Sequence, residues 1–300
     1  MPQEIENSEE GLRIKCKPSI REIDLRDTGQ KNVHTSIYPW DWLYRHSYRP
    51  RLEKKKTRPL HLWGSEIMES PPTADYKEVM VSDAGVAKWT ANIEGYGFSF
   101  IDGVPSTPEA TQKLVERIAF VKPTHYGGFW DFTSNLDHKD TAYTTLALKA
   151  HTDTTYFTQP AGLQIFHLLE FDGRGGESLL VDGFRAAKVL REQHPDAYKL
   201  LSKIRIPTHS AGDENVCIQP SVDYGLPVLN HDPTTADLYQ IRWNNNDRST
   251  MNFWGEGESV EEFYNAIKKW DTVLTMKENE FWEQLRPGRA LSMSFHHLYY

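Results

Sequence analysis

The pattern of apolar and polar residues divides the 300-residue chain into two parts near residue 75. The first part contains short extended runs, which predict strands at residues 12–16, 19–25 and 33–37. The segment Ser70-Pro71-Pro72-Thr73 then interrupts the pattern, as proline-rich segments between domains do. We therefore expect a small β-rich module over residues 1–75 and a larger domain over residues 76–300.

The larger part carries both helical and strand periodicities. A helix is predicted at residues 107–119, with Thr107 as its N-cap and Pro108 at its first position. Ser259 and Glu262 form a capping box, which predicts that a second helix begins there. Further helices are predicted at residues 86–93, 184–193 and 196–202, and strands at residues 98–101, 163–171, 177–181, 227–229, 238–244 and 290–295.

Two loops add to this pattern. The glycine-rich segment 172–176 lies between two predicted strands, so a β-hairpin is expected there. Residues 122–145 mix Gly, Asp, Asn and Thr with aromatic residues, which is typical of a functional loop. Many strands with a few helices predict a mainly β domain, either a β-sandwich or a jelly-roll barrel with supporting helices.

Composition narrows the class of protein. With 38% hydrophobic and 25% charged residues the chain is an ordinary globular sequence, and its net charge of −8 disfavours nucleic acid as a partner. No apolar run approaches the roughly 20 residues of a membrane span. Two distant cysteines indicate a reducing compartment, and the first ten residues carry four glutamates and no arginine, unlike a mitochondrial presequence. We expect a cytosolic protein.

The triplet His151-Thr152-Asp153 is the first chemical signal. On an extended strand, residues two apart point to one face, so an imidazole and a carboxylate can reach one ion. Two histidines and a carboxylate on one face of iron(II) leave positions open for co-substrate and oxygen. His-x-Asp occurs three times, but the pairs beginning at His138 and His194 lie in a polar loop and a helical turn. The alternative for His151 is a satisfied surface histidine.

The ordered motifs around this triplet form a longer signature: DTAYT at 140–144, HTDTTYF at 151–157, GG at 175–176, VDGF at 181–184, RWNN at 242–245 and ENEFW at 278–282. It resembles the γ-butyrobetaine and trimethyllysine dioxygenases from about residue 30 to residue 289, and the trimethyllysine enzymes most. The resemblance implies a double-stranded β-helix (a jelly roll) that uses iron(II), 2-oxoglutarate, oxygen and ascorbate as reductant. It implies hydroxylation of Nε-trimethyllysine at its β-carbon, the first step of carnitine synthesis.

The same resemblance assigns substrate-binding residues. A trimethylammonium group has no hydrogen to donate, so aromatic faces must hold it, and Tyr126, Trp130 and Tyr143 match the family's cage positions. Asp140 matches the position that meets the α-ammonium, and Asn244 the one that meets the carboxylate. Core packing is the alternative for the aromatics and a turn is the alternative for Asp140. γ-Butyrobetaine, which lacks the ammonium, is the alternative substrate.

The N-terminal module resembles the family's small zinc-binding domain. His34 matches its zinc histidine and Cys16 one of its cysteines, but the other cysteines are absent, so a closed four-ligand zinc site is not expected. A polar surface residue is the alternative for His34. We expect a small-molecule substrate, with neither nucleic acid nor membrane as a partner, and leave a homodimer open.

The end of the sequence departs from the family. There a strand after Pro-Gly-Arg leads to the second iron histidine, and a later arginine grips 2-oxoglutarate. Here Tyr300 aligns with that histidine, while His296 and His297 stand about 10 Å short along a strand. We therefore expect the third iron ligand and the arginine to be missing, both ends to be truncated and turnover to be low. The alternative to an enzyme is a catalytically incomplete family member, and a mitochondrial location follows if the true N-terminus is missing.

Overall fold

The computed structural model describes residues 2–16, 34–47, 60–133, 147–210, 217–221, 224–251, 254, 257, 259–294 and 298–299. The chain forms two compact units, residues 1–57 and residues 58–300, which are described separately below. Asp140, Tyr143, His296 and His297 lie outside the described residues. None of the described helices is long and apolar enough to cross a bilayer.

The first unit is a three-stranded antiparallel sheet. Its strands β1 (Pro2–Asn7), β2 (Gly11–Cys16) and β3 (His34–Pro39) lie in that order, and α1 (Trp40–Arg45) follows β3. Strands were predicted where β2 and β3 lie, but β1 was missed because its alternate residues are mostly polar. Gly11 is the only buried residue among the described part of this unit, so the sheet has very little core of its own.

The second unit is built on two main sheets. One has the order β4 (Thr73–Asp75), β5 (Phe98–Asp102), β13 (Arg289–Ser294) and β6 (Leu163–His167), and the other has the order β12 (Glu280–Glu283), β7 (Ser178–Asp182) and β14 (Leu298–Tyr299). Except for the parallel pair β4–β5, these strands pair antiparallel. Two smaller antiparallel sheets join β8 (Arg205–Ile206) to β9 (Leu226–Pro227) and β10 (Leu229–His231) to β11 (Leu238–Ile241).

The predicted hairpin over residues 163–181 is wrong. Strand β6 pairs with β13, whereas β7 pairs with β12 and β14, so the glycine-rich segment carries the chain from one sheet to the other. Gly173, Gly175 and Gly176 have positive φ angles, which allow the chain to reverse direction without a tight turn. Pairing with distant strands buries both faces of β7, which a local hairpin would not do.

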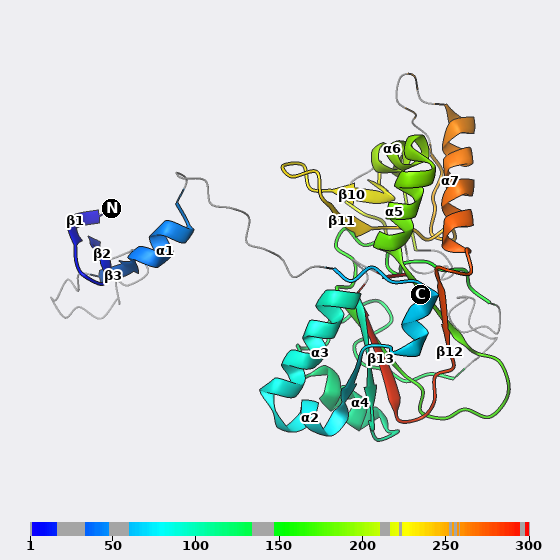
Figure 1. Ribbon diagram of the computed structural model, residues 1–300, viewed down its shortest axis with the longest axis horizontal. Helices are drawn as coiled ribbons and strands as arrows, with labels where there is room; N and C mark the ends of the chain where they lie inside the picture. The colour runs from blue at the N-terminus through cyan, green and yellow to red at the C-terminus, as the bar shows by residue number, and fades with distance from the viewer. Residues whose placement is uncertain are drawn as a thin grey trace. The chain divides into compact units, whose positions relative to one another are not determined.

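Helices gather in two groups (Figure 1). Helices α2 (Tyr76–Val81), α3 (Asp83–Tyr96) and α4 (Pro108–Val115) accompany the four-stranded sheet, and α5 (Gly183–Gln193), α6 (Pro195–Lys203) and α7 (Val260–Leu274) pack against one another beside β10 and β11. The predicted caps are confirmed, because Thr107 accepts from the Ala110 amide at 3.2 Å and Ser259 accepts from the Glu262 amide at 3.3 Å.

The unit boundary differs from the expected one. The units divide between residues 57 and 58, not near residue 75, because Trp63 and Ile67 pack with Phe98 and Phe281 in the core of the second unit. Ile67 belongs to the short 3-10 helix η2 (Ser65–Glu69).

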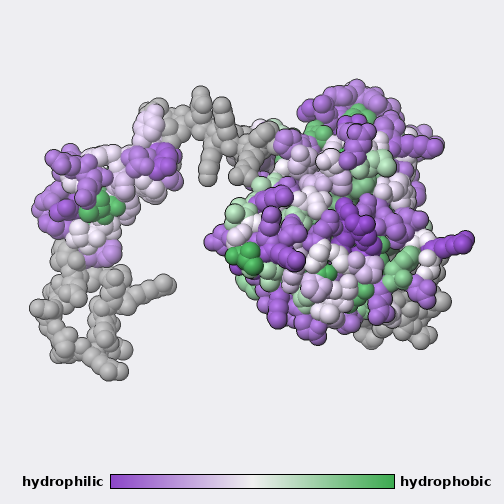
Figure 2. All heavy atoms as spheres, turned by 60° about the horizontal axis from the view of Figure 1, so that its bottom comes forward, coloured by the Kyte–Doolittle hydropathy of each residue, from purple (hydrophilic) through white to green (hydrophobic). Residues whose placement is uncertain are grey.

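Figure 2 shows a mainly hydrophilic face of the second unit with isolated apolar residues.

Asp182 joins the start of this unit to its centre. One carboxylate oxygen caps α5 by accepting from the amides of Phe184 at 2.9 Å and Arg185 at 3.1 Å. The other accepts from the amide of Trp63 at 2.9 Å. A buried carboxylate is tolerated only when it is hydrogen-bonded in this way.

His167 connects three elements through a neutral ring. Its Nε2 accepts from the Gly288 amide at 3.2 Å, and its Nδ1 lies 2.8 Å from the hydroxyl of Thr111, which itself donates to Thr107 O. These partners fix the proton on Nδ1. Burial lowers the pKa of His167, in keeping with a ring held uncharged.

His167 makes stability depend on pH. Its folded pKa lies below the ordinary value of 6.5, so its contribution is complete above about pH 6.5 and is lost as the pH falls toward the folded pKa. Urea unfolding at pH 7.5 and 5.5 should show a larger loss for the unaltered chain than for His167→Asn. An equal loss in both would show that His167 is not the titrating group.

Candidate functional site

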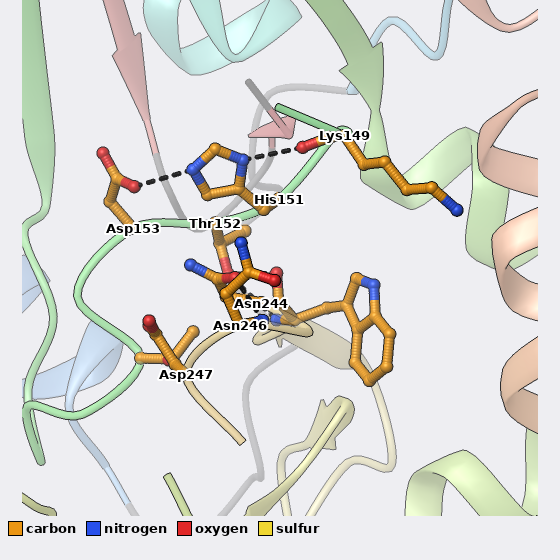
Figure 3. A network of polar contacts seen from close by, with 9 residues as sticks. Lys149, His151, Thr152, Asp153, Asn244, Asn246 and Asp247 are labelled. Carbon is orange, nitrogen blue, oxygen red and sulfur yellow. Dashed lines mark hydrogen bonds and ion pairs between the residues drawn. The ribbon is translucent and has the colours of Figure 1, made fainter. Parts of the chain in front are cut away.

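The side chains of His151 and Asp153 meet. His151 Nε2 lies 3.0 Å from Asp153 Oδ1, and His151 Nδ1 donates to the backbone carbonyl of Lys149 at 2.8 Å (Figure 3). Because the carbonyl can only accept, Nδ1 must carry a proton, and Nε2 is the nitrogen available to a metal ion. This is the orientation that a metal-binding histidine needs.

The two residues do not lie on a strand, contrary to the prediction. Residues 153–156 form turns, and Thr154 has a φ of +55°, in the left-handed region that β-branched residues rarely adopt. The chain therefore bends directly after Asp153. The alternation of side chains holds over the short stretch 151–153, which is sufficient to bring the imidazole and the carboxylate together.

Each partner shifts the pKa of the other. Burial alone lowers the pKa of His151, but the hydrogen bond and negative charge of Asp153 outweigh it, so that this pKa is raised. Burial alone raises the pKa of Asp153, but the contact with His151, together with a hydrogen bond from Gln164, lowers it. The pair is therefore favoured as imidazolium and carboxylate, and a divalent cation could replace the proton between them.

The loop that carries the pair is fastened to the segment after β11. Thr152 donates its amide to Trp243 O at 2.8 Å, and its hydroxyl accepts from the Trp243 amide at 2.9 Å. Thr155 donates its hydroxyl to Asp247 at 2.6 Å. Because Thr152 bonds to this segment, its neighbours His151 and Asp153 are turned toward each other.

Arg242 holds the second half of the same loop. This buried guanidinium donates to three carbonyl oxygens, those of Thr155, of Phe157 at 2.7 Å and of Thr158 at 3.4 Å. Burial lowers the pKa of Arg242 to about 10, so it stays charged at neutral pH. The sequence showed Arg242 only as part of the RWNN motif. Its contacts with backbone carbonyls could not be predicted, because no sequence pattern indicates which arginine binds carbonyl oxygens.

We expect Arg242→Met to release the loop. The change should lower the free energy of unfolding by about 3 kcal/mol, because three carbonyls lose a charged donor, and should weaken Mn(II) binding at the His151–Asp153 pair. Urea unfolding and metal titration check the two effects.

Two variants make this test specific. Arg242→Lys keeps the positive charge but lacks the several donors of the planar guanidinium group, so its stability and metal affinity should be intermediate. Arg205→Met removes a single bond to Gly225 O and should leave metal binding unchanged. Metal affinity that is unaltered in Arg242→Met would contradict the positioning of the loop by Arg242.

Two predicted cage residues lie together. The ring centroids of Tyr126 and Trp130 are 6.2 Å apart, and the side chains are 36% and 38% exposed, so part of each side chain is reached by solvent. Phe132 packs on Trp130 at 4.7 Å and His125 lies 5.7 Å from Tyr156, which connects the aromatic loop to the loop of His151. Sequence reasoning missed both contacts.

Asn244 follows β11 and lies at the same segment. Its Oδ1 accepts from the amide of Asn246 at 3.0 Å, which orients the carboxamide so that Nδ2 remains as a donor. An amide nitrogen held in this way suits a carboxylate acceptor.

The metal-binding potential of the described residues rests on this pair. No cluster of three or more His, Cys, Asp or Glu side chains occurs among them. Gln164 Oε1 is buried without a hydrogen-bond partner in the described part of the chain, while its side chain contacts Asp153, so an unsatisfied oxygen lies beside the pair. The donor set fits a ferrous ion that completes its shell with further ligands.

The N-terminal candidates lie opposite each other. Cys16 and His34 are cross-strand neighbours in the β2–β3 ladder, and His34 Nε2 lies 2.9 Å from the Ser36 hydroxyl. No third ligand accompanies them among the described residues of the first unit.

The fold defines a class of protein first. The chain is similar to a solved taurine dioxygenase from Burkholderia xenovorans, with a TM-score of 0.52 and 12% identity over 73% of this chain and 74% of that one. This likeness shows a jelly-roll oxygenase fold. The family model "Taurine catabolism dioxygenase TauD, TfdA family" matches residues 56–292, and the chain belongs to this family.

Comparison with individual relatives shows which members of the family this chain is similar to. It is 45% identical to the trimethyllysine dioxygenase of Neurospora crassa and 44% identical to that of Meyerozyma guilliermondii, over 86% of this chain in both cases. The chain spans 61% and 67% of the length of these two proteins. Human γ-butyrobetaine dioxygenase is more distant, at 29% identity.

Proposed function

We propose that the chain hydroxylates Nε-trimethyllysine with iron(II) and 2-oxoglutarate. The observation that carries the proposal is the convergence of His151 Nε2 and Asp153 Oδ1 to 3.0 Å on a loop fixed by Thr152 and Arg242. The similarity to two trimethyllysine dioxygenases supports the substrate.

The chain's own groups would hold and orient the reactants. His151 and Asp153 would bind the ferrous ion, which supplies oxygen activation coupled to oxidative decarboxylation of 2-oxoglutarate. Tyr126 and Trp130, with Tyr143, would surround the trimethylammonium group, each ring contributing roughly 0.5–2 kcal/mol. Asp140 would meet the α-ammonium and Asn244 the α-carboxylate.

The function is tested with the full 300-residue chain. Iron(II), ascorbate, 2-oxoglutarate and trimethyllysine are supplied, and succinate and hydroxytrimethyllysine are followed together with trimethyllysine binding. Selective binding of trimethyllysine over γ-butyrobetaine supports the proposal, whereas a preference for γ-butyrobetaine favours the other substrate. Turnover that His296→Ala or His297→Ala abolishes would identify the third ligand.

Metal binding should depend on His151. We expect His151→Ala to weaken Mn(II) or iron(II) binding at least about tenfold, because one of two described ligands is removed. His194→Ala is the matched control, since His194 begins another His-x-Asp triplet but stands at the N-cap position of α6 without a side-chain capping bond. Equal affinity of the His151 variant and the unaltered chain in a metal titration would exclude this site.

The aromatic loop of Tyr126 and Trp130 should distinguish trimethyllysine from unmethylated lysine. Trp130→Ala should weaken trimethyllysine binding by about tenfold and lysine binding far less, because an unmethylated ammonium does not depend on the ring faces alone. Trp282→Ala, an exposed tryptophan on β12, is the control. Calorimetry that gives equal losses for both ligands would indicate packing instead of recognition.

A further inference from the structure

We propose that Arg248, together with Asn244, forms a subsite for a carboxylate group beside the loop of His151. The subsite rests on the proposed function only for the source of its ligand, which we take to be the α-carboxylate of trimethyllysine. Arg248 has no role in the assignments made above.

A small pocket opens at this position. It is lined in part by Arg242, Arg248, Asn244, Thr155 and Trp243. The charged residues of this lining are therefore two arginines, in a chain whose net charge is −8. A local excess of positive charge in an acidic protein favours an anionic ligand.

The backbone and two rings fix Arg248 in place. Residues 207–209 pair with residues 247–249, because the Ser249 amide donates to Pro207 O at 2.8 Å and the His209 amide donates to Asp247 O at 2.9 Å. The guanidinium carbon lies 5.9 Å from the Trp243 ring centroid and 5.5 Å from that of Tyr264. Rings that hold the guanidinium in this way leave its hydrogen-bonding edges available.

The donors of Arg248 are unused. Among the described residues it makes no hydrogen bond or ion pair, and its Nε is buried without a partner. Arg242, six residues earlier, donates to three carbonyls instead. A buried donor left unsatisfied costs free energy, and most such groups in folded proteins have a partner. A ligand that accepts from Arg248 would satisfy it.

The remaining groups of the pocket select an acceptor. The Thr155 hydroxyl donates to Asp247 and the Thr208 hydroxyl donates to Thr155 O, so neither adds a donor, and the case for an acceptor rests on the donors of Arg248 and Asn244. Asn244 Oδ1 accepts from the Asn246 amide, which orients the carboxamide, and Nδ2 remains as a donor. A carboxylate only accepts, is planar and matches the guanidinium fork with both of its oxygens.

The test compares acids with their amides. Trimethyllysine and its α-carboxamide, and propionate and propionamide, are titrated into the full chain at constant ionic strength. The unaltered chain should prefer the acid by about tenfold or more, and Arg248→Gln should largely abolish that preference. Arg248→Lys should be intermediate. Arg191→Gln, which alters an arginine packed on the ring of Tyr198, is the matched control and should keep the full preference.

Each result decides one question. Loss of the preference for trimethyllysine in Arg248→Gln supports the subsite with the substrate as its source. A loss confined to propionate, or a fall in 2-oxoglutarate affinity alone, supports the carboxylate subsite and assigns it another source. If trimethyllysine does not bind at all but the preference for propionate depends on Arg248, the proposed function fails and the subsite stands. An unchanged preference for every acid in Arg248→Gln overturns the subsite.

Discussion

The candidate site depends on one set of hydrogen bonds, those between the loop of His151 and the segment that begins at Arg242. The loop pairs with no strand in the described part of the chain, so no β-ladder seen there holds His151 and Asp153 together. Thr152 bonds to Trp243 on one side, and Arg242 binds three carbonyls further along. The pair can be preorganised for a metal ion only because a distant segment supplies the bonds that a ladder would otherwise provide.

Two arginines six residues apart illustrate how partners decide the task of a side chain. Arg242 is buried and its donors are directed at carbonyl oxygens, which compensate a charge that has no carboxylate beside it among the described residues. Arg248 is held by aromatic rings, and its side chain has no hydrogen-bond partner among the described residues. The first is suited to fixing the loop, and the second is suited to receiving a ligand. Sequence spacing alone does not distinguish them.

Elements with strong local signals were predictable from the sequence. The helix after Thr107 and the helix after Ser259 have caps that can be read from a few residues, and both are present. The hairpin prediction failed because strand partners are chosen by packing between distant segments. For the site, the convergence of His151 with Asp153 follows from the alternation of side chains, whereas the turn at Thr154 does not, because tertiary bonds impose it.

Under the proposed function, the loop of His151 would hold the residues that bind the two ends of the substrate. His125 contacts Tyr156, so the aromatic loop with Trp130 rests on the chain just after the metal pair. Asn244 lies on the segment bonded to the same loop. The residues proposed to bind the cationic end and the anionic end of a ligand would therefore be held at fixed positions relative to each other and to His151 and Asp153. Under the proposed function, a small displacement of that loop would move both binding ends relative to the reacting carbon, so the bonds from Arg242 that hold the loop would also keep the substrate positioned.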